Sequence, residues 1–235
     1  TDPADVTRLM ESQRAVLFAT DPPYLVGYDG KNHPHKWGEP DKNKDWSESY
    51  HDWDDPEQGE ALYDAFVGVA RETALVDEAA WYCWHASRGQ AMLEDVWKRH
   101  GAFVHQQIIW AKDRPVLTRS WYMWQHEPCF FGWVQGKKPK RVADDYPPSV
   151  WMIPTIAPGQ QTDHPTSKPL ELFAIPMRQH TVPGEVCSEP FAGSGSQFVA
   201  GEQLGRLVYG IEIQPEYCAV ILERLSKMGL EPRLA

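Results

Sequence analysis

The sequence predicts an α/β fold built on a mostly parallel sheet, and three observations support this prediction. Apolar runs of strand length alternate along the chain with stretches of helical periodicity. Within residues 185–213, a strand, a glycine-containing turn, a helix and a second strand follow one another. Of the 235 residues, 42% are hydrophobic and 24% are charged, a composition typical of a globular domain with a sizeable core. Strands that alternate with helices pair in parallel, so the sheet is expected to be mostly parallel.

Each predicted strand is a short apolar run that ends at proline, glycine or polar residues. The first, RAVLFAT, stops at two consecutive prolines, which disrupt both strands and helices. The second, AAWYCWHA, is rich in aromatic residues that we expect in the core, as we do Trp110 and Trp133 in later strands. The predicted strands span residues 14–20, 79–86, 103–111, 128–134, 185–191 and 207–213.

The helices are predicted from apolar spacing and from their end signals. Pro169 and Pro215 each stand near the first turn of a helix, and Gly229 lies just beyond the last one. The predicted helices span residues 3–13, 57–76, 88–100, 169–179, 196–204 and 215–228. The remaining stretches 25–56, 112–128 and 135–167 have no clear period and are predicted to be loops.

Charge and composition exclude several classes of protein. With 23 Lys and Arg against 33 Asp and Glu, the formal net charge of −10 argues against a general nucleic-acid coat protein. It does not exclude an enzyme that contacts DNA through a local basic strip. No run of 18 apolar residues and no secretory signal appear, and the four cysteines form no CxxC pair, so a reducing cytoplasm is expected. His33, His35 and His51 lack further ligands at suitable spacing, so no metal is expected.

The glycine turn near the C-terminus favours a nucleoside cofactor. Gly193 and Gly195 allow a tight turn between a strand and a helix and a close approach of a ligand to the backbone. Glu212 follows Gly195 by 17 residues, at the end of the next strand, where a carboxylate can accept both ribose hydroxyls. No Gly-Lys-Ser/Thr sequence follows the turn, which argues against a nucleoside triphosphate. An ordinary strand-to-helix turn is the alternative.

The loop Asp21-Pro22-Pro23-Tyr24 offers groups that suit an amine on a planar ring. The Asp21 carboxylate and the Pro22 carbonyl can accept two N–H donors, and Tyr24 offers a flat face for stacking. The prolines stiffen the loop. A proline-stiffened turn without chemistry is the alternative for this motif taken alone.

Together, this loop and the downstream FAGSG (191–195) resemble the DNA amino-methyltransferases that use S-adenosylmethionine to methylate adenine N6 or cytosine N4. The catalytic loop precedes the cofactor turn, as in the β class of that family. Four further segments are most similar to short phage and prophage modification methylases: AAWYCWHA, QQIIWAKDRP, WQHEPCFFGW and HPTSKPLEL. The resemblance spans residues 1–229. It implies a Rossmann-like methyltransferase fold with a mostly parallel, seven-stranded sheet and helices on both faces.

The resemblance implies roles for individual residues. Asp21, Pro22, Pro23 and Tyr24 would bind and orient the target amine. Asp21 also counts among the residues expected to line the cofactor, together with Lys168 near its methionine end, Glu212 at its ribose, and Glu189, Phe191, Ala192, Gly193, Ser194 and Gly195. Glu189 stands where the family usually has Asp. Asp at the first position of the catalytic loop is the usual adenine form, whereas Ser is commoner in cytosine enzymes.

The implied function is site-specific transfer of a methyl group from S-adenosylmethionine to adenine N6 in duplex DNA, with base flipping and S-adenosylhomocysteine as the product. A cytosine-N4 enzyme and a non-catalytic recognition module are the alternatives. Residues 1–235 are expected to form one methyltransferase domain, with 25–56 as a mobile loop and 135–167 as a small insertion for DNA recognition. A restriction-modification role, a homodimer, a missing upstream domain and a partner subunit remain open. The location is expected to be cytoplasmic, at the nucleoid, without a membrane.

Contacts to DNA phosphates are expected from two basic stretches. One lies in the insertion and the other in the mobile loop, and their cations are Lys137, Lys138, Lys140, Arg141, Lys31 and Lys36. A solvated basic surface is the alternative. Trp121, Tyr122 and Trp124 are candidates for surface stacking.

Overall fold

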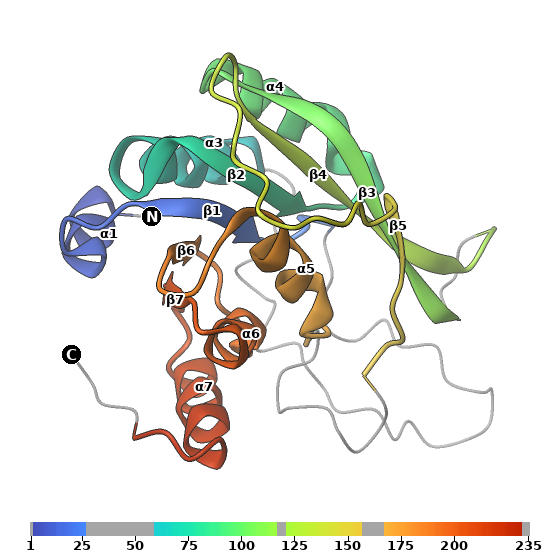
Figure 1. The fold of residues 1–235 in the computed structure, drawn as a ribbon. Coiled ribbons are helices and arrows are strands. Elements are labelled where there is room, and N and C mark those ends of the chain that lie inside the picture. Colours follow the sequence, from blue (N-terminus) through green and yellow to red (C-terminus); the bar gives the residue numbers. More distant parts are fainter. Residues whose placement is uncertain (1, 27–58, 117–120, 157–166, 232–235) are drawn as a thin grey trace.

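The computed structural model describes residues 2–26, 59–116, 121–156 and 167–231. Its centre is a seven-stranded sheet with the order β5-β3-β4-β2-β1-β6-β7 (Figure 1). The strands are β1 (Ala15–Thr20), β2 (Leu75–Trp84), β3 (Ala102–Val116), β4 (Trp124–Val134), β5 (Val150–Met152), β6 (Val186–Glu189) and β7 (Leu207–Gly210). β4 pairs antiparallel with both β2 and β3, and all other neighbours pair in parallel. The predicted mostly parallel sheet is therefore confirmed.

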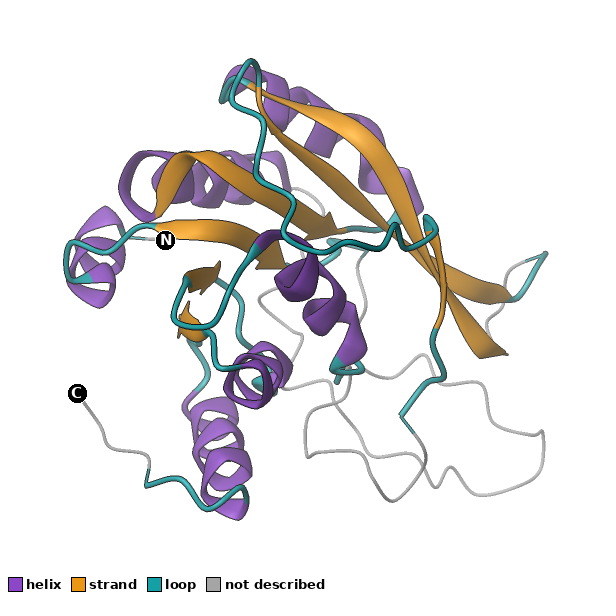
Figure 2. Cartoon of the chain, in the orientation of Figure 1, coloured by secondary structure: helices purple, strands orange, loops and turns teal. Residues whose placement is uncertain are grey.

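Helices cover both faces of this sheet, as predicted (Figure 2). The helices are α1 (Pro3–Met10), α3 (Gly59–Val69), α4 (Gln90–Arg99), α5 (Glu171–His180), α6 (Ser196–Leu204) and α7 (Pro215–Lys227). A π-helical turn, Ala70–Ala74, continues α3 and leads directly into β2. Among the described residues, none of the helices is both long and apolar enough to cross a bilayer.

Two apolar cores lie on the two faces because side chains alternate along each strand. On one face, Phe18 and Trp81 pack with α1, α3 and α4. On the other, Leu17, Tyr82 and Trp84 pack with α5 and α6. The strand tryptophans expected in the core are all buried, and Trp81, at 0% exposure, is enclosed by the rings of Phe18 and Trp97.

β1, β2, β6 and β7 all run in the same direction, and we call the edge where they end the carboxyl edge. β3 also points toward this edge, because β4 is antiparallel to both β2 and β3. The predicted catalytic loop follows β1, and the glycine turn follows β6. Since β1 and β6 are neighbours in the sheet, the two motifs meet at the carboxyl edge, where ligands of open α/β sheets bind.

Several boundaries differ from the sequence expectation, and three of the differences change the description of the sheet. Residues 112–128 do not form a mixed loop: β3 continues to Val116, and β4 begins at Trp124, so the two strands form a long hairpin. Trp110 is the last apolar residue of β3 in the core, and the part of the hairpin beyond it lacks the apolar alternation that marks a strand. Within 135–167, the three residues of β5 add an edge strand to β3. β2 begins at Leu75, and the preceding helical stretch ends at Ala74.

Candidate active site

The catalytic loop leaves β1 at a fully buried residue, Thr20, and is held in place by contacts on both sides. The Asp21 carboxylate forms an ion pair with Lys168, whose Nζ donates a hydrogen bond to Oδ2 at 2.7 Å. The Tyr63 hydroxyl, from α3, donates to the Pro23 carbonyl at 3.0 Å. Leu25, directly after the loop, has a φ of 54°. The loop is thus a fixed element of the carboxyl edge.

Lys168 joins the catalytic loop to the cofactor turn. Its ammonium pairs with Asp21, while its own carbonyl accepts a 2.8 Å hydrogen bond from the Ser196 hydroxyl at the start of α6. The Lys168 side chain is only 10% exposed, and its Nζ lies 5.2 Å from the centroid of the Tyr24 ring. These contacts bring together residues that are 147 positions apart in the sequence.

Two further charged residues at this site were not predicted. Glu127, near the start of β4, accepts the Tyr24 hydroxyl at 2.7 Å and lies 3.3 Å from Lys168 Nζ. Lys112, from β3, lies 2.6 Å from the other oxygen of Glu127. Burial alone would raise the pKa of Glu127, but the charges of Lys168 and Lys112 hold this pKa at about 2. Glu127 is therefore an anion throughout the physiological pH range.

Only one of the two oxygens of the Asp21 carboxylate has a hydrogen-bond donor among the described residues. Oδ2 binds Lys168, whereas Oδ1 is buried and has no hydrogen-bond partner among the described residues. Burial raises the pKa of Asp21, and the nearby Lys168 opposes this change. A buried acceptor without a donor is costly unless a ligand supplies one, so Oδ1 is suited to receive an N–H group from a bound molecule.

The cofactor turn has the shape that a nucleoside ligand needs. Gly193 and Gly195 adopt φ values of 51° and 76°, in the left-handed region that glycine tolerates best. Glu212, just beyond β7, accepts the backbone N–H of Gly193 at 2.7 Å and that of Gln214 at 2.8 Å. A carboxylate has about four acceptor positions, so Glu212 can also accept ribose hydroxyls. The turn and a carboxylate at the next strand end fit the nucleoside part of S-adenosylmethionine.

The other predicted cofactor residues lie in or beside this turn. Arg224 of α7 donates to the Ser194 carbonyl at 2.5 Å and thereby braces the turn from outside. The Phe191 ring packs edge-on against Phe66, with centroids 5.0 Å apart, and Ala192 is buried. The structure thus gathers Asp21, Lys168, Glu189, Phe191, Ala192, Gly193, Ser194, Gly195 and Glu212 at the ends of β1, β6 and β7.

Glu189, at the end of β6, is 2% exposed and already has protein partners at both oxygens. Oε1 accepts the Thr20 hydroxyl at 2.7 Å and the Phe191 N–H at 3.0 Å. In the amide orientation that satisfies both neighbours, Gln197 donates to Oε2 at 2.9 Å and to the Ala19 carbonyl at 2.8 Å. Glu189 therefore ties β1, β6 and α6 together behind the site.

Glu189→Gln should flatten the pH dependence of stability. Burial raises the pKa of Glu189 well above its ordinary value, so the folded protein holds this proton more tightly than the unfolded chain. The resulting stability is present below the unfolded pKa of about 4.3 and is lost as the pH rises through the folded pKa. We expect the free energy of unfolding of wild-type protein to fall more than that of the variant over the pH interval above the ordinary pKa of a carboxyl group. Urea denaturation at a series of pH values measures this difference.

Glu185→Gln is the matched control for that experiment. Glu185 pairs with Lys140 away from the site, and its pKa is lowered rather than raised. Its stabilising contribution is lost only at lower pH, so its removal should leave the slope over this interval unchanged. Parallel wild-type and Glu189→Gln profiles would contradict the assignment.

The basic cluster 137–141 lies away from the active site. β4 runs antiparallel to β1, so the chain that follows Val134 begins at the edge of the sheet opposite Asp21. Lys137 pairs there with Asp77 at 3.1 Å, and Lys140 pairs with Glu185. Arg141 stacks on Tyr146 and Lys138 is exposed. Lys31 and Lys36 lie outside the described residues.

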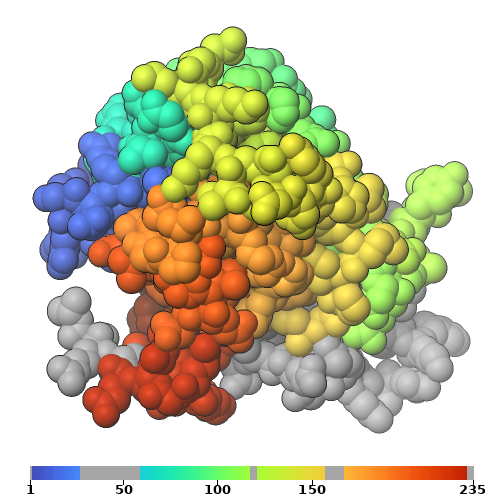
Figure 3. Space-filling view, in the orientation of Figure 1, coloured from blue at the N-terminus to red at the C-terminus, as the bar shows by residue number. Residues whose placement is uncertain are grey.

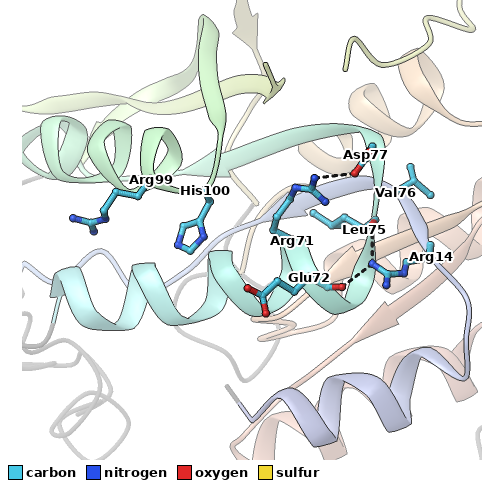
Figure 4. A pocket seen from close by; sticks show the side chains of 8 residues that line it. All are labelled: Arg14, Arg71, Glu72, Leu75, Val76, Asp77, Arg99 and His100. Carbon is cyan, nitrogen blue, oxygen red and sulfur yellow. Dashed lines mark hydrogen bonds and ion pairs between the residues drawn. The ribbon is translucent and has the colours of Figure 1, made fainter. Parts of the chain in front are cut away.

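At the same opposite edge, a surface depression of about 710 Å³ opens between the start of β2 and the end of α4 (Figure 4). Arg14 donates there to the carbonyls of Glu72 and Leu75, and Arg71 pairs with Asp77 at 2.8 Å. Its cations are thus largely neutralised by neighbours, and it shares no residue with the carboxyl edge. The described residues contain no group of three or more His, Cys, Asp or Glu side chains that could hold a metal ion.

The fold and the two adjoining loops define the class of this protein as an α/β methyltransferase. The family model described as DNA methylase, of the N6/N4 type, matches residues 16–223. The chain belongs to the N6/N4 DNA methylase family, which confirms the amino-methyltransferase resemblance and, with it, S-adenosylmethionine as the cofactor. Its substrate class is DNA, with an exocyclic amine of adenine or cytosine as the methyl acceptor.

Individual relatives agree with this assignment. The type II methyltransferase M2.MboI of Moraxella bovis is 25% identical, over 91% of this chain and 81% of the relative. YubD of Escherichia coli (strain K12), named as a methylase, is 28% identical over 89% of this chain and 81% of its own length. Among solved structures, the M1.HpyAVI–SAM complex matches with a TM-score of 0.67 and 20% identity, covering 96% of this chain and 97% of that one. The cytosine-N4-specific PvuII DNA methyltransferase matches with the same TM-score and 16% identity, covering 98% and 86%. These structural likenesses support the fold.

Proposed function

We propose that this chain methylates the N6 amine of adenine in duplex DNA, at a specific site and on a base flipped out of the helix. The observation that supports this most directly is Asp21 Oδ1, a buried oxygen without a hydrogen-bond donor among the described residues. The other oxygen of Asp21 binds Lys168, which contacts both the Tyr24 ring and the start of α6. Aspartate at this position is, by resemblance, the usual adenine form. Cytosine N4 carries the same kind of amine and is the alternative, because the same acceptors suit it.

In this proposal the loop positions the amine and makes it nucleophilic. The lone pair of an exocyclic amine is delocalised into the ring, so acceptance of its N–H bonds by Asp21 Oδ1 and the Pro22 carbonyl favours a pyramidal nitrogen. The Tyr24 ring stacks on the base, a contact worth about 1–3 kcal/mol. S-adenosylmethionine, held at the turn 191–195 and Glu212, would supply a methyl group bonded to a cationic sulfur; that S–C bond breaks as the N–C bond forms, and neutral S-adenosylhomocysteine leaves. The residues contribute mainly orientation and electrostatics.

The amine must lose one proton overall. Asp21 Oδ1 is in a position to receive it after the N–C bond has formed, and burial makes this carboxylate more basic than an exposed one. Lys168 remains paired with Oδ2 throughout. Since the proton leaves after methyl transfer, Asp21 need not be a strong base.

The hairpin formed by β3 and β4 is the DNA-facing feature of the described structure in this proposal. Its free end projects from the body of the molecule (Figure 3), beyond the carboxyl edge. Trp121 and Tyr122 near that end are 99% and 88% exposed. Exposed aromatic rings offer stacking surfaces for bases. The basic cluster 137–141 lies at the opposite edge of the sheet from this hairpin end, and two of its lysines pair with acidic residues there.

Product analysis tests this function. Purified protein is incubated with unmethylated duplex DNA and S-adenosylmethionine, and the digested nucleosides are separated by mass spectrometry. We expect N6-methyladenine with wild-type protein and about a hundredfold to a thousandfold less of it with Asp21→Asn. N4-methylcytosine would overturn the adenine assignment and retain the class of enzyme. The absence of both products, with cofactor binding intact, would instead favour a recognition module.

A further inference from the structure

Four charged side chains form a continuous buried chain at the active site, in the order Lys112, Glu127, Lys168, Asp21. The successive nitrogen-to-oxygen distances are 2.6, 3.3 and 2.7 Å. The side chains are between 10% and 19% exposed. We call this group the ion-pair chain. Its two cations and two anions give it a formal charge of zero.

Stability alone does not explain the ion-pair chain. Removing charges from water costs several kcal/mol per ion, and a buried pair is often no more stabilising than packed apolar residues. Glu127 and Lys112 come from the hairpin, outside both the catalytic loop and the cofactor turn. Glu127 nevertheless pairs directly with Tyr24 and Lys168, which contact the catalytic loop and Asp21, and Lys112 pairs with Glu127. The hairpin therefore supports the residues that meet the substrate.

We propose that Glu127 and Lys112 are positioning residues of the methyl-transfer site. Through Lys168 and Tyr24, they fix Asp21 with one oxygen occupied and the other presented to the target amine. They also set the local charge to zero, which would favour a cationic sulfonium in comparison with a site of net positive charge. This inference rests on the proposed function, because it concerns the same site.

Charge-changing variants at the two hairpin positions should therefore have opposite effects. Glu127→Gln keeps the shape and an oxygen that can accept the Tyr24 hydroxyl, but it leaves the ion-pair chain with one excess positive charge. Lys112→Met leaves one excess negative charge. S-adenosylmethionine carries a positive sulfur and S-adenosylhomocysteine a neutral one, so the ratio of their dissociation constants reports the local charge.

Calorimetry of the purified full chain with each of the two compounds measures that ratio. We expect Glu127→Gln to weaken the binding of S-adenosylmethionine relative to that of S-adenosylhomocysteine by about tenfold. Lys112→Met should change the ratio of the two dissociation constants in the opposite direction. The double variant restores neutrality, so its ratio should return toward that of wild type. Glu185→Gln, which removes a carboxylate paired with Lys140 away from the site, should leave the ratio unchanged.

Kinetics tests the positioning part of the proposal. We expect Glu127→Gln to lower kcat by about tenfold to a hundredfold with little change in the KM for DNA, because the target amine still binds but meets a misplaced Asp21. Equal losses of affinity for both cofactor forms in each single variant, or a wild-type kcat in Glu127→Gln, would overturn the proposal. If Glu127→Gln does not fold, as judged by circular dichroism, Lys112→Met still shows in which direction the ratio of the two dissociation constants changes. If the wild-type protein methylates no DNA, the proposed function fails, and the two dissociation constants still test the charge balance.

Discussion

Asp21→Asn should reduce methyl transfer by about a hundredfold to a thousandfold, the usual effect of removing one preorganised polar group from an active site. The substitution keeps the size of the side chain, but it replaces one acceptor oxygen with an NH₂ group that can only donate. It also removes the negative partner of Lys168, 2.7 Å away. The amide can turn its NH₂ group away from Lys168, and that group would then face the target amine at the position of Oδ1. Two donors would oppose each other there, and the amine would no longer be activated.

Transfer of a labelled methyl group to unmethylated DNA measures this loss under single-turnover conditions. The cofactor turn is separate from Asp21 in sequence and has its own partners, so we expect S-adenosylmethionine still to bind. Asp77→Asn is the matched control, because Asp77 also pairs with a lysine, Lys137, but lies at the opposite edge of the sheet. Asp77→Asn should retain full activity. An Asp21→Asn enzyme within a few-fold of wild type would show that the Asp21 carboxylate does not activate the amine.

Sequence reasoning could locate both halves of the active site because each is a short motif at the end of a strand. The loop Asp21–Tyr24 and the turn 191–195 contain proline and glycine, whose backbone restrictions are evident in sequence. The parallel arrangement of β1 and β6 then brings the two motifs together. Contacts within one motif or between neighbouring parallel strands are thus predictable from local pattern and fold class.

The hairpin residues could not be assigned in this way. Lys112 and Glu127 meet only through the register of an antiparallel pair whose arms extend beyond the core, in a stretch without apolar alternation. Both lie in segments that resemble the methyltransferase family, QQIIWAKDRP and WQHEPCFFGW, and this was the available signal. A charged residue immediately before the apolar run of β4 was a second indication.

The position of the basic cluster 137–141 could not be predicted from local sequence either. Composition marks it as basic, but its position depends on the direction of β4. A parallel strand would have delivered this cluster to the carboxyl edge. Because β4 is antiparallel, the cluster begins at the opposite edge and pairs with acidic residues there, Asp77 and Glu185 among them. Strand direction is a property of the whole sheet, which local pattern does not contain.

Gly195→Ala should impair both stability and cofactor binding, since Gly195 combines a left-handed backbone with close packing. Its φ of 76° costs an L-residue about 1–2 kcal/mol. An added Cβ would also lie 2.8 Å from Cγ1 and 3.2 Å from Cγ2 of Ile221 on α7. These are the branched atoms of a β-branched side chain, which cannot swing aside. Overpacking of this kind costs a further 1–3 kcal/mol, roughly.

Gly136→Ala separates the two contributions. Gly136 has almost the same φ, 77°, but nothing lies within 4 Å of its added Cβ. We expect urea denaturation to show the backbone cost alone in Gly136→Ala and the larger combined cost in Gly195→Ala. Calorimetry should show wild-type affinity for S-adenosylmethionine in Gly136→Ala and at least about a tenfold loss in Gly195→Ala, because the turn must shift to relieve the contact with Ile221. Equal destabilisation of the two variants, with cofactor affinity retained in both, would mean that the backbone turn at Gly195 can move without consequence for the site.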